Sequence, residues 1–235
     1  MLVERLHLAT GSDHVPGYRF GIGSGARKRD RPCPAPTART ISRPRSMTHR
    51  TKRRIAIVST GGTIEKTYDE LQGVLQNELS NLDVLLASLR LDGVELVRVP
   101  LMNKDSLDMS PADHTLIAQT VGSMAAGLDG VVVVHGTDRL AVTGDRIVEL
   151  LGTPRVPVVL TGAMRPFVMR NTDAAQNMTE ALLAVQVMPA GVYVAMHNRV
   201  LRFPGVVKDR ARMTFAMADE LADGADERGG AHSGS

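Results

Sequence analysis

Two threonines flanked by glycine follow two of the most apolar segments of the chain. Thr63 lies in TGGTI, directly after the apolar run 54–59, and Thr137 lies in HGTD, directly after the valine-rich run 130–134. A threonine hydroxyl can attack a carbonyl carbon, or orient the group that does, once a neighbour takes its proton. Glycine lets a small ligand approach the backbone N–H groups. The two segments therefore indicate a site for nucleophilic chemistry on a small carbonyl compound.

These segments have two other interpretations. TGGTI lacks the third glycine of a dinucleotide-binding fingerprint and the lysine-hydroxyl ending of a P-loop, which disfavours nucleotide binding. Thr and Asp also cap helices, so Thr63, Thr137 and Asp138 have a purely structural interpretation. The presence of both motifs after strands favours a functional role for all three residues.

These loops must be held by the elements around them, which alternate between strands and helices. Short apolar runs predict strands at 54–59, 94–99, 130–134, 156–161 and 191–196. Helical spacing and capping signals predict helices near 82–89, 110–126, 140–151 and 173–187. The alternation predicts an open, mostly parallel α/β sheet with helices on both faces. Ligands bind beyond the carboxyl ends of such strands, which is where both threonines fall.

Charge is distributed unevenly along the 235 residues. Residues 1–54 hold 13 of the 28 Lys and Arg but only three acids, whereas the remaining residues hold 15 basic and 22 acidic side chains. A nucleic-acid-binding fold needs a basic surface on its folded part. We therefore expect the folded part to be acidic, with no nucleic-acid partner.

The remaining composition excludes several classes of protein. Cys33 is the only cysteine, so no intramolecular disulfide and no thiolate metal site can form. The histidines form no metal-ligand pattern, and we expect neither a metal nor another cofactor. The longest apolar run is about five residues, against the roughly 18 to 20 that span a bilayer. These features predict a cytoplasmic protein that does not contact a membrane.

The two ends of the chain differ in composition from its middle. Residues 1–50 have no regular apolar period and are broken repeatedly by Gly and Pro, so we expect a disordered basic extension. The same glycines and prolines disfavour a transit peptide, and Met47 is the expected translation start. We expect a folded domain over 54–216 and a flexible, small and polar tail over 217–235.

TGGTI, HGTD and GAMRP follow successive strands in this order, and with them the sequence resembles the bacterial-type L-asparaginase family. The resemblance extends over about residues 54–215 and implies the Rossmann-like α/β fold of that family's amino-terminal domain. Family members usually continue into a smaller carboxyl-terminal domain. The resemblance implies a short form of the family without that second domain.

The resemblance also implies a role for each matching residue. Thr63 corresponds to the nucleophile that forms an acyl-enzyme with the side-chain amide carbon of the substrate. Thr137, Asp138 and Lys208 correspond to a Thr-Lys-Asp triad, and Tyr68 corresponds to a lid tyrosine that assists Thr63. Asp138 would also bind the α-amino group of the substrate. Ser106 would bind the α-carboxylate of the substrate. Backbone N–H groups at Gly62 and Gly136 would stabilise the oxyanion, and the carbonyl of Ala163 would accept from the departing nitrogen.

The implied activity is the hydrolysis of L-asparagine to L-aspartate and ammonia by a homo-oligomer, with glutamine as a minor substrate. Two positions depart from the family pattern: Leu107 replaces a glutamine, and Arg139-Leu140 replaces Thr-Met. The glutamate that the second domain donates across a dimer interface has no counterpart. A catalytically weak or silent amino-acid-binding or regulatory domain is therefore the alternative function.

Overall fold

A computed structural model describes residues 52–69, 74–77 and 80–221 of the chain. The extension expected over residues 1–50 lies outside these ranges. Of the tail expected from residue 217, residues 217–221 are described. Met217 closes a strand, the Ala218 N–H donates to the Gly205 carbonyl, and Glu220 pairs with Arg199 at 2.7 Å.

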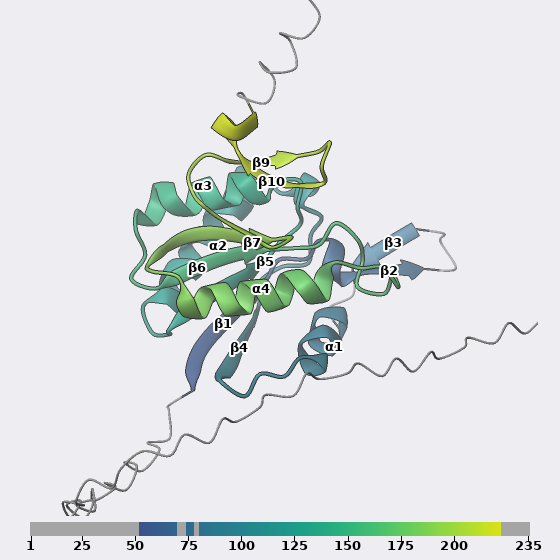
Figure 1. The fold of residues 1–235 in the computed structure, drawn as a ribbon, viewed down its shortest axis with the longest axis horizontal. Helices are drawn as coiled ribbons and strands as arrows, with labels where there is room; N and C mark the ends of the chain where they lie inside the picture. Colours follow the sequence, from purple (N-terminus) through teal and green to yellow (C-terminus); the bar gives the residue numbers. More distant parts are fainter. Residues whose placement is uncertain (1–51, 70–73, 78–79, 222–235) are drawn as a thin grey trace, which may run out of the picture. The chain divides into compact units, whose positions relative to one another are not determined.

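A six-stranded sheet with the order β4-β1-β5-β6-β7-β8 forms the centre of the described residues (Figure 1). Neighbouring strands are parallel from β4 to β7, and β8 runs antiparallel at the edge. The strands are β1 (Arg53–Ser59), β4 (Val94–Pro100), β5 (Gly130–Val134), β6 (Pro157–Thr161), β7 (Gly191–Met196) and β8 (Arg199–Arg202). The five predicted strands and the mostly parallel α/β fold are confirmed.

Helices cover both faces of this sheet. Alternate residues of β1 point to opposite faces: Ile55 and Ile57 pack in a core with the residues of α1 and α4, while Ala56 and Val58 pack with those of α2 and α3. Because both faces are covered, the strands are apolar throughout rather than alternating. The four helices are α1 (Ser80–Ser88), α2 (Pro111–Ala125), α3 (Leu140–Leu151) and α4 (Ala174–Val187).

Local signals set the helix ends where the sequence predicts them. Ser110 and Asp113 form a reciprocal capping box at the start of α2, whose first residue is Pro111. Gly152 follows α3 with a φ of 62°, a left-handed conformation that glycine adopts without strain.

Two small hairpins and two short turns were not predicted. The hairpins pair β2 (Lys66–Asp69) with β3 (Val74–Asn77) and β9 (Val206–Asp209) with β10 (Thr214–Met217). The 3₁₀ turns are η1 (Thr63–Glu65) and η2 (Ser106–Asp108). Elements of three or four residues are too short to show a period, and tertiary contacts decide them. β9 contacts α3, and β10 contacts β7 and β8.

The connections reverse direction between β1 and β5. From β1 the chain crosses to β4 on one side, and from β5 it continues to β6 on the other. In open parallel sheets ligands bind at such a switch point, because the loops that follow the two strands lead away in opposite directions. TGGTI and HGTD are the two loops at this switch point.

Candidate active site

Glycine allows the loops after β1, β4 and β5 to touch. A Cβ atom on Gly62 would lie 2.5 Å from the Gly136 nitrogen, and one on Gly136 would lie 2.6 Å from Ser106 Oγ. Gly62 also has a φ of 91°, which side-chain-bearing residues rarely adopt. The structure therefore brings together the three predicted substrate-binding residues Gly62, Gly136 and Ser106.

Thr137, Asp138 and Lys208 form one hydrogen-bonded cluster at the same edge of the sheet. Lys208 Nζ donates to Thr137 Oγ1 at 2.8 Å and to Asp138 Oδ1 at 3.0 Å. Thr137 is 4% exposed and the Lys208 side chain 13% exposed, so water screens these contacts only weakly. Lys208 lies on β9, and the β9–β10 hairpin brings it to a loop about seventy residues earlier in the chain.

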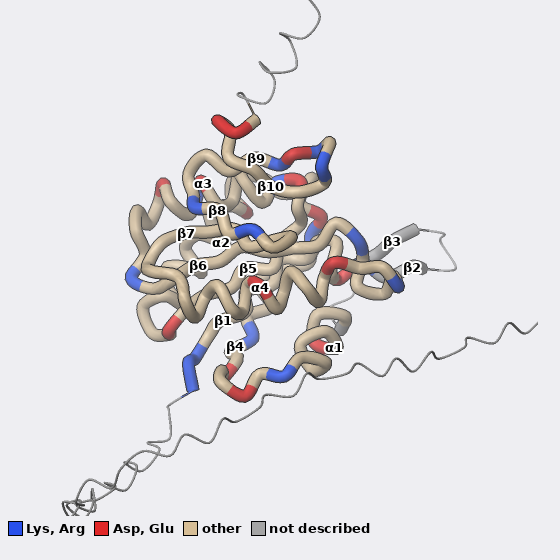
Figure 2. The backbone as a smooth tube through the Cα atoms, in the orientation of Figure 1, with Lys and Arg blue, Asp and Glu red and all other residues tan. Residues whose placement is uncertain are grey.

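Asp138 does not cap the following helix. Arg139 stands at the N-cap position of α3 and makes no side-chain capping bond. The Asp138 carboxylate instead accepts from Lys208 and pairs with Arg210 at 3.2 Å. Figure 2 shows basic and acidic residues close together around the β9–β10 hairpin. Arg210 was not predicted, and it lies in the turn that follows β9.

Thr63 begins the turn η1 and is partly exposed. The turn is anchored behind it, since Ile64 and Glu65 are buried and the Glu65 N–H donates to the Gly62 carbonyl. In the same part of the chain, neither carboxylate oxygen of Glu65 finds a hydrogen-bond donor. Burial raises the pKa of Glu65 to about 7, against the lowering effect of Arg98.

Tyr68 lies on β2, opposite Leu75 of β3. Only the backbone is described at these two positions, so the assisting role of the Tyr68 side chain stays a prediction.

The loop that contains Ala163 is held from behind by α4. The N–H groups of Met164 and Arg165 both donate to the Asp173 carboxylate, and Asn177 Nδ2 donates to the Gly162 carbonyl at 2.9 Å. A trans peptide carries its C=O and N–H on opposite sides. Because the Met164 N–H faces Asp173, the Ala163 carbonyl faces away from Asp173.

Asp173 is therefore an ionised anchor for this loop. Burial opposes its ionisation, but the hydrogen bonds from Met164, His197 and Arg165 outweigh burial and hold the pKa of Asp173 below its ordinary value. Asp173 and the fully buried Asn177 were not predicted to support the site. The sequence signal is a pair of polar residues four positions apart at the start of an otherwise apolar helix face.

Ser106 is 1% exposed, and its hydroxyl has no hydrogen-bond partner among the residues that the structure describes. A buried, unused hydroxyl beside Gly136 suits a residue that binds a ligand, because buried polar groups otherwise find partners. The neighbouring Leu107 is 55% exposed, and its N–H donates to the Asp105 carboxylate.

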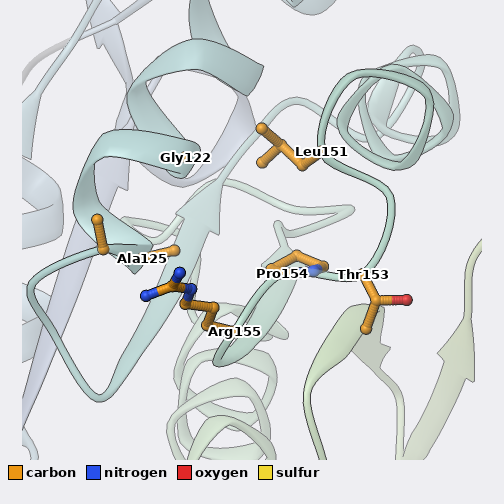
Figure 3. Close-up of a pocket in the computed structure, with 7 residues that line it drawn as sticks. Gly122, Ala125, Leu151, Thr153, Pro154 and Arg155 are labelled. Carbon is orange, nitrogen blue, oxygen red and sulfur yellow. The ribbon is translucent and has the colours of Figure 1, made fainter.

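A separate pocket lies between the carboxyl-terminal ends of α2 and α3 (Figure 3). Thr153, Pro154 and Arg155 line it on the segment that leads into β6, at the amino-terminal end of that strand. It is therefore at the opposite end of the strands from Thr137. Its lining contains no hydroxyl paired with a lysine or a carboxylate, so we place the chemistry at the switch point.

Two further observations concern membrane-spanning helices and metal sites. No helix within the described ranges is long and apolar enough to cross a membrane. Over those same ranges, no three His, Cys, Asp or Glu side chains gather in a way that could hold a metal ion.

The fold and the site define a doubly wound α/β protein with a Thr-Lys-Asp cluster at its switch point. The chain belongs to the asparaginase family, since residues 54–221 match the model of the asparaginase amino-terminal domain.

The known relatives include proteins of two kinds. The L-asparaginase of Thermococcus kodakarensis is 34% identical over 150 residues, which cover 63% of this chain and 45% of that protein. A subunit of the glutamyl-tRNA(Gln) amidotransferase of Haloquadratum walsbyi is 37% identical over 145 residues, which cover 61% of this chain and 33% of that protein. The chain thus spans less than half the length of these two relatives.

Solved structures of L-asparaginases also superpose on this chain. The thermostable L-asparaginase of T. kodakarensis superposes with a TM-score of 0.64 at 30% identity, over 70% of this chain and 51% of that one. A probable cytoplasmic L-asparaginase of Campylobacter jejuni superposes with a TM-score of 0.59 at 31% identity, over 71% of this chain and 52% of that one.

Proposed function

We propose that this chain hydrolyses the side-chain amide of L-asparagine to L-aspartate and ammonia through a threonine acyl-enzyme. The observation that carries the proposal is the buried contact of Lys208 with Thr137 and Asp138 beside the glycine loops. The similarity to L-asparaginases supports the choice of substrate.

Two half-reactions make up the proposed cycle. Thr63 Oγ1 attacks the amide carbon, the C–N bond breaks, and ammonia leaves with the proton that the hydroxyl gave up. Water then attacks the ester carbon, which releases L-aspartate and restores the Thr63 hydroxyl. Thr137 takes the proton of the attacking group and passes its own to Lys208, and the same relay returns a proton to the departing nitrogen.

The backbone and two side chains bind the substrate in this scheme. N–H groups of the Gly62 and Gly136 loops face the developing oxyanion, and the Ala163 carbonyl accepts from the departing nitrogen. Asp138 binds the α-ammonium group, and the unused hydroxyl of Ser106 binds the α-carboxylate. Arg210 is exposed and pairs with Asp138, so it must give way or share this carboxylate when the substrate binds.

We further propose that the protein works in the cytoplasm as a homo-oligomer and binds asparagine weakly. Leu107 cannot replace the side-chain amide of a glutamine, and each lost charge-assisted contact weakens binding by ~10- to 100-fold. Leu183, Val187 and Val200 are exposed and offer an apolar surface to a second copy. A KM in the low micromolar range from a protein that light scattering shows to be monomeric would contradict both statements.

Ammonia release from asparagine by the purified chain tests the activity, with glutamine as the parallel substrate because one group of relatives is named as amidotransferase subunits. The control is Thr179→Val, a change on the exposed surface of α4 away from the Lys208 cluster, which should leave ammonia release unchanged. We expect release from asparagine to exceed release from glutamine. Heat released on binding asparagine, with no ammonia formed, would instead support the silent binding domain.

A further inference from the structure

A line of three hydrogen bonds connects α2 through α3 to the HGTD loop. His114 Nδ1 lies 2.7 Å from Thr143 Oγ1, Thr143 Oγ1 lies 2.8 Å from His135 Nε2, and His135 Nδ1 lies 2.7 Å from the Gly136 carbonyl oxygen. Thr143 and His135 are fully buried and His114 is 3% exposed. Buried polar groups destabilise a core unless they are paired, so these three contacts favour one arrangement of protons, although His114 Nε2 has no partner among the described residues.

The chemistry of the four groups fixes the position of every proton along the line. A carbonyl oxygen only accepts, so His135 donates from Nδ1 to Gly136. Burial lowers the pKa of His135 to about 4, so the ring is neutral near pH 7 and its Nε2 accepts. Thr143 Oγ1 also lies 3.4 Å from the Arg139 carbonyl oxygen, but His135 Nε2 at 2.8 Å is the closer acceptor, so the one hydroxyl proton goes to His135. Thr143 must then accept from Nδ1–H of His114.

The inner end of the line sets the plane of a peptide in the candidate active site. Because the Gly136 carbonyl is held on the imidazole of His135, the Thr137 N–H of the same trans peptide points to the opposite side. The Gly136 backbone also abuts Gly62 and Ser106. The line therefore controls how Gly136 and Thr137 are presented at the switch point.

We propose that Thr143 and His135, with His114 as the outer anchor, are positioning residues that hold the Gly136–Thr137 peptide in the orientation that amide hydrolysis requires. The inference rests on the proposed function. None of the three side chains touches the substrate in this scheme. They act through the peptide, and Thr143 links the two rings because its hydroxyl proton goes to His135 and its oxygen accepts from His114.

Thr143→Val tests the link, since valine keeps the shape and removes the hydroxyl. Nitrogen-15 spectra of the imidazoles should show His114 and His135 of the wild type as Nδ1–H tautomers, and the variant should lose this fixed form at His114. We expect kcat to fall about tenfold, the effect of one buried hydrogen bond, with KM changed less than about threefold. Thr143→Ser restores the hydroxyl and should restore both the tautomer and kcat.

Thr179→Val is the matched control, because Thr179 is an exposed helical threonine whose hydroxyl bonds only to the Ala175 carbonyl of its own helix. It should leave kcat and both imidazole spectra unchanged. Should Thr143→Val fail to fold, His114→Phe keeps an aromatic ring and removes the donor to Thr143. A fall of kcat by a few fold with unchanged KM is then expected, and an unchanged kcat overturns the proposal.

Other outcomes separate the positioning role from the proposed function. An Nε2–H tautomer at His135 in the wild type, or an unchanged kcat in folded Thr143→Val, overturns the positioning role. If the wild type releases ammonia from neither asparagine nor glutamine, the proposed function fails. The positioning role is then tested by the chemical shift of the Thr137 backbone amide. A shift of that resonance in Thr143→Val and its return in Thr143→Ser support it, whereas no shift overturns it.

Discussion

The loops that carry Thr137 and Thr63 end neighbouring strands but differ in how far they are organised. Thr137 is buried, lies 2.8 Å from Lys208, and follows a residue whose carbonyl is bound by His135. Thr63 is partly exposed, and two residues later the buried carboxylate of Glu65 has no partner in the described part of the chain. Thr137 therefore lies within a network of hydrogen bonds, whereas Thr63, the proposed nucleophile, lies on a turn beside a carboxyl group that has no hydrogen-bond partner in the described part of the chain.

The elements that follow each threonine explain the difference. Thr137 leads into α3, whose Leu140, Thr143 and Ile147 are buried in the main core. Thr63 leads through η1 into β2, which pairs only with β3 in a separate two-stranded sheet within the described residues. Hydrogen bonds that are already formed reduce the rearrangement that a reaction requires. The asymmetry therefore suits a site in which the proposed base, Lys208, is held in place and the proposed nucleophile, Thr63, moves into position.

Replacing the nucleophile should have the largest effect. Thr63→Ala should reduce kcat by at least about 1,000-fold without lowering the melting temperature, because a partly exposed hydroxyl contributes little to the core. Thr63→Ser should retain measurable turnover. Ammonia release and thermal unfolding on the same preparations check this. If the alanine variant keeps more than about a tenth of the activity, Thr137 and not Thr63 is the better candidate for the nucleophile.

Removing the fixed base should have the next largest effect. Lys208→Met keeps much of the side-chain volume and should reduce kcat by about 100- to 1,000-fold, since general-base catalysis contributes about that much. Asp138 retains Arg210 as an ionic partner, so the variant should fold. Turnover near the wild-type rate in a folded Lys208→Met variant would mean that the Thr137 cluster has no part in proton transfer.

Glu65→Gln should change how the free energy of unfolding depends on pH, and it should not change which reaction is catalysed. The folded-state pKa of about 7 lies above the ordinary value of 4.5, so the folded protein binds a proton that the unfolded chain releases. The free energy of unfolding should therefore fall as pH rises from about 4.5 through about 7, by up to ~3 kcal/mol.

Urea unfolding at several pH values measures this slope. The glutamine variant, which cannot ionise, should be less sensitive to pH over the same range. Glu149→Gln is the control, because Glu149 is exposed and pairs with Arg146 on the helix surface. Equal slopes in the wild type and Glu65→Gln would show that the carboxyl group of Glu65 is not the source of the instability.

The smallest effect is expected from the amino-terminal extension. Deleting residues 1–46 should leave activity and melting temperature unchanged, because that segment has no periodic apolar face with which to pack. That result would mean that the difference between the Thr63 and Thr137 loops does not depend on residues 1–46. A fall of several degrees in melting temperature would show that the extension packs on the domain.

The sequence alone determined the framework and the location of the site. Five apolar runs and four helical patterns predicted the strands and helices because each depends on residues close together in the chain. The glycine motifs marked the strand ends at which parallel sheets bind ligands. Lys208 was assigned only through the family resemblance, because nothing in the residues around it distinguishes it from an exposed lysine.

Only the tertiary structure decided which side chains meet at that site. Lys208 reaches Thr137 across 71 positions of the chain, and His114 reaches Thr143 across 29. Likewise, the contact of Arg210 with Asp138 and the burial of Glu65 follow from how the hairpins and helices pack. Backbone periodicity is a short-range property that the sequence displays directly. A hydrogen bond between distant segments depends on distances of a few tenths of an ångström, which are set only when the whole core has packed.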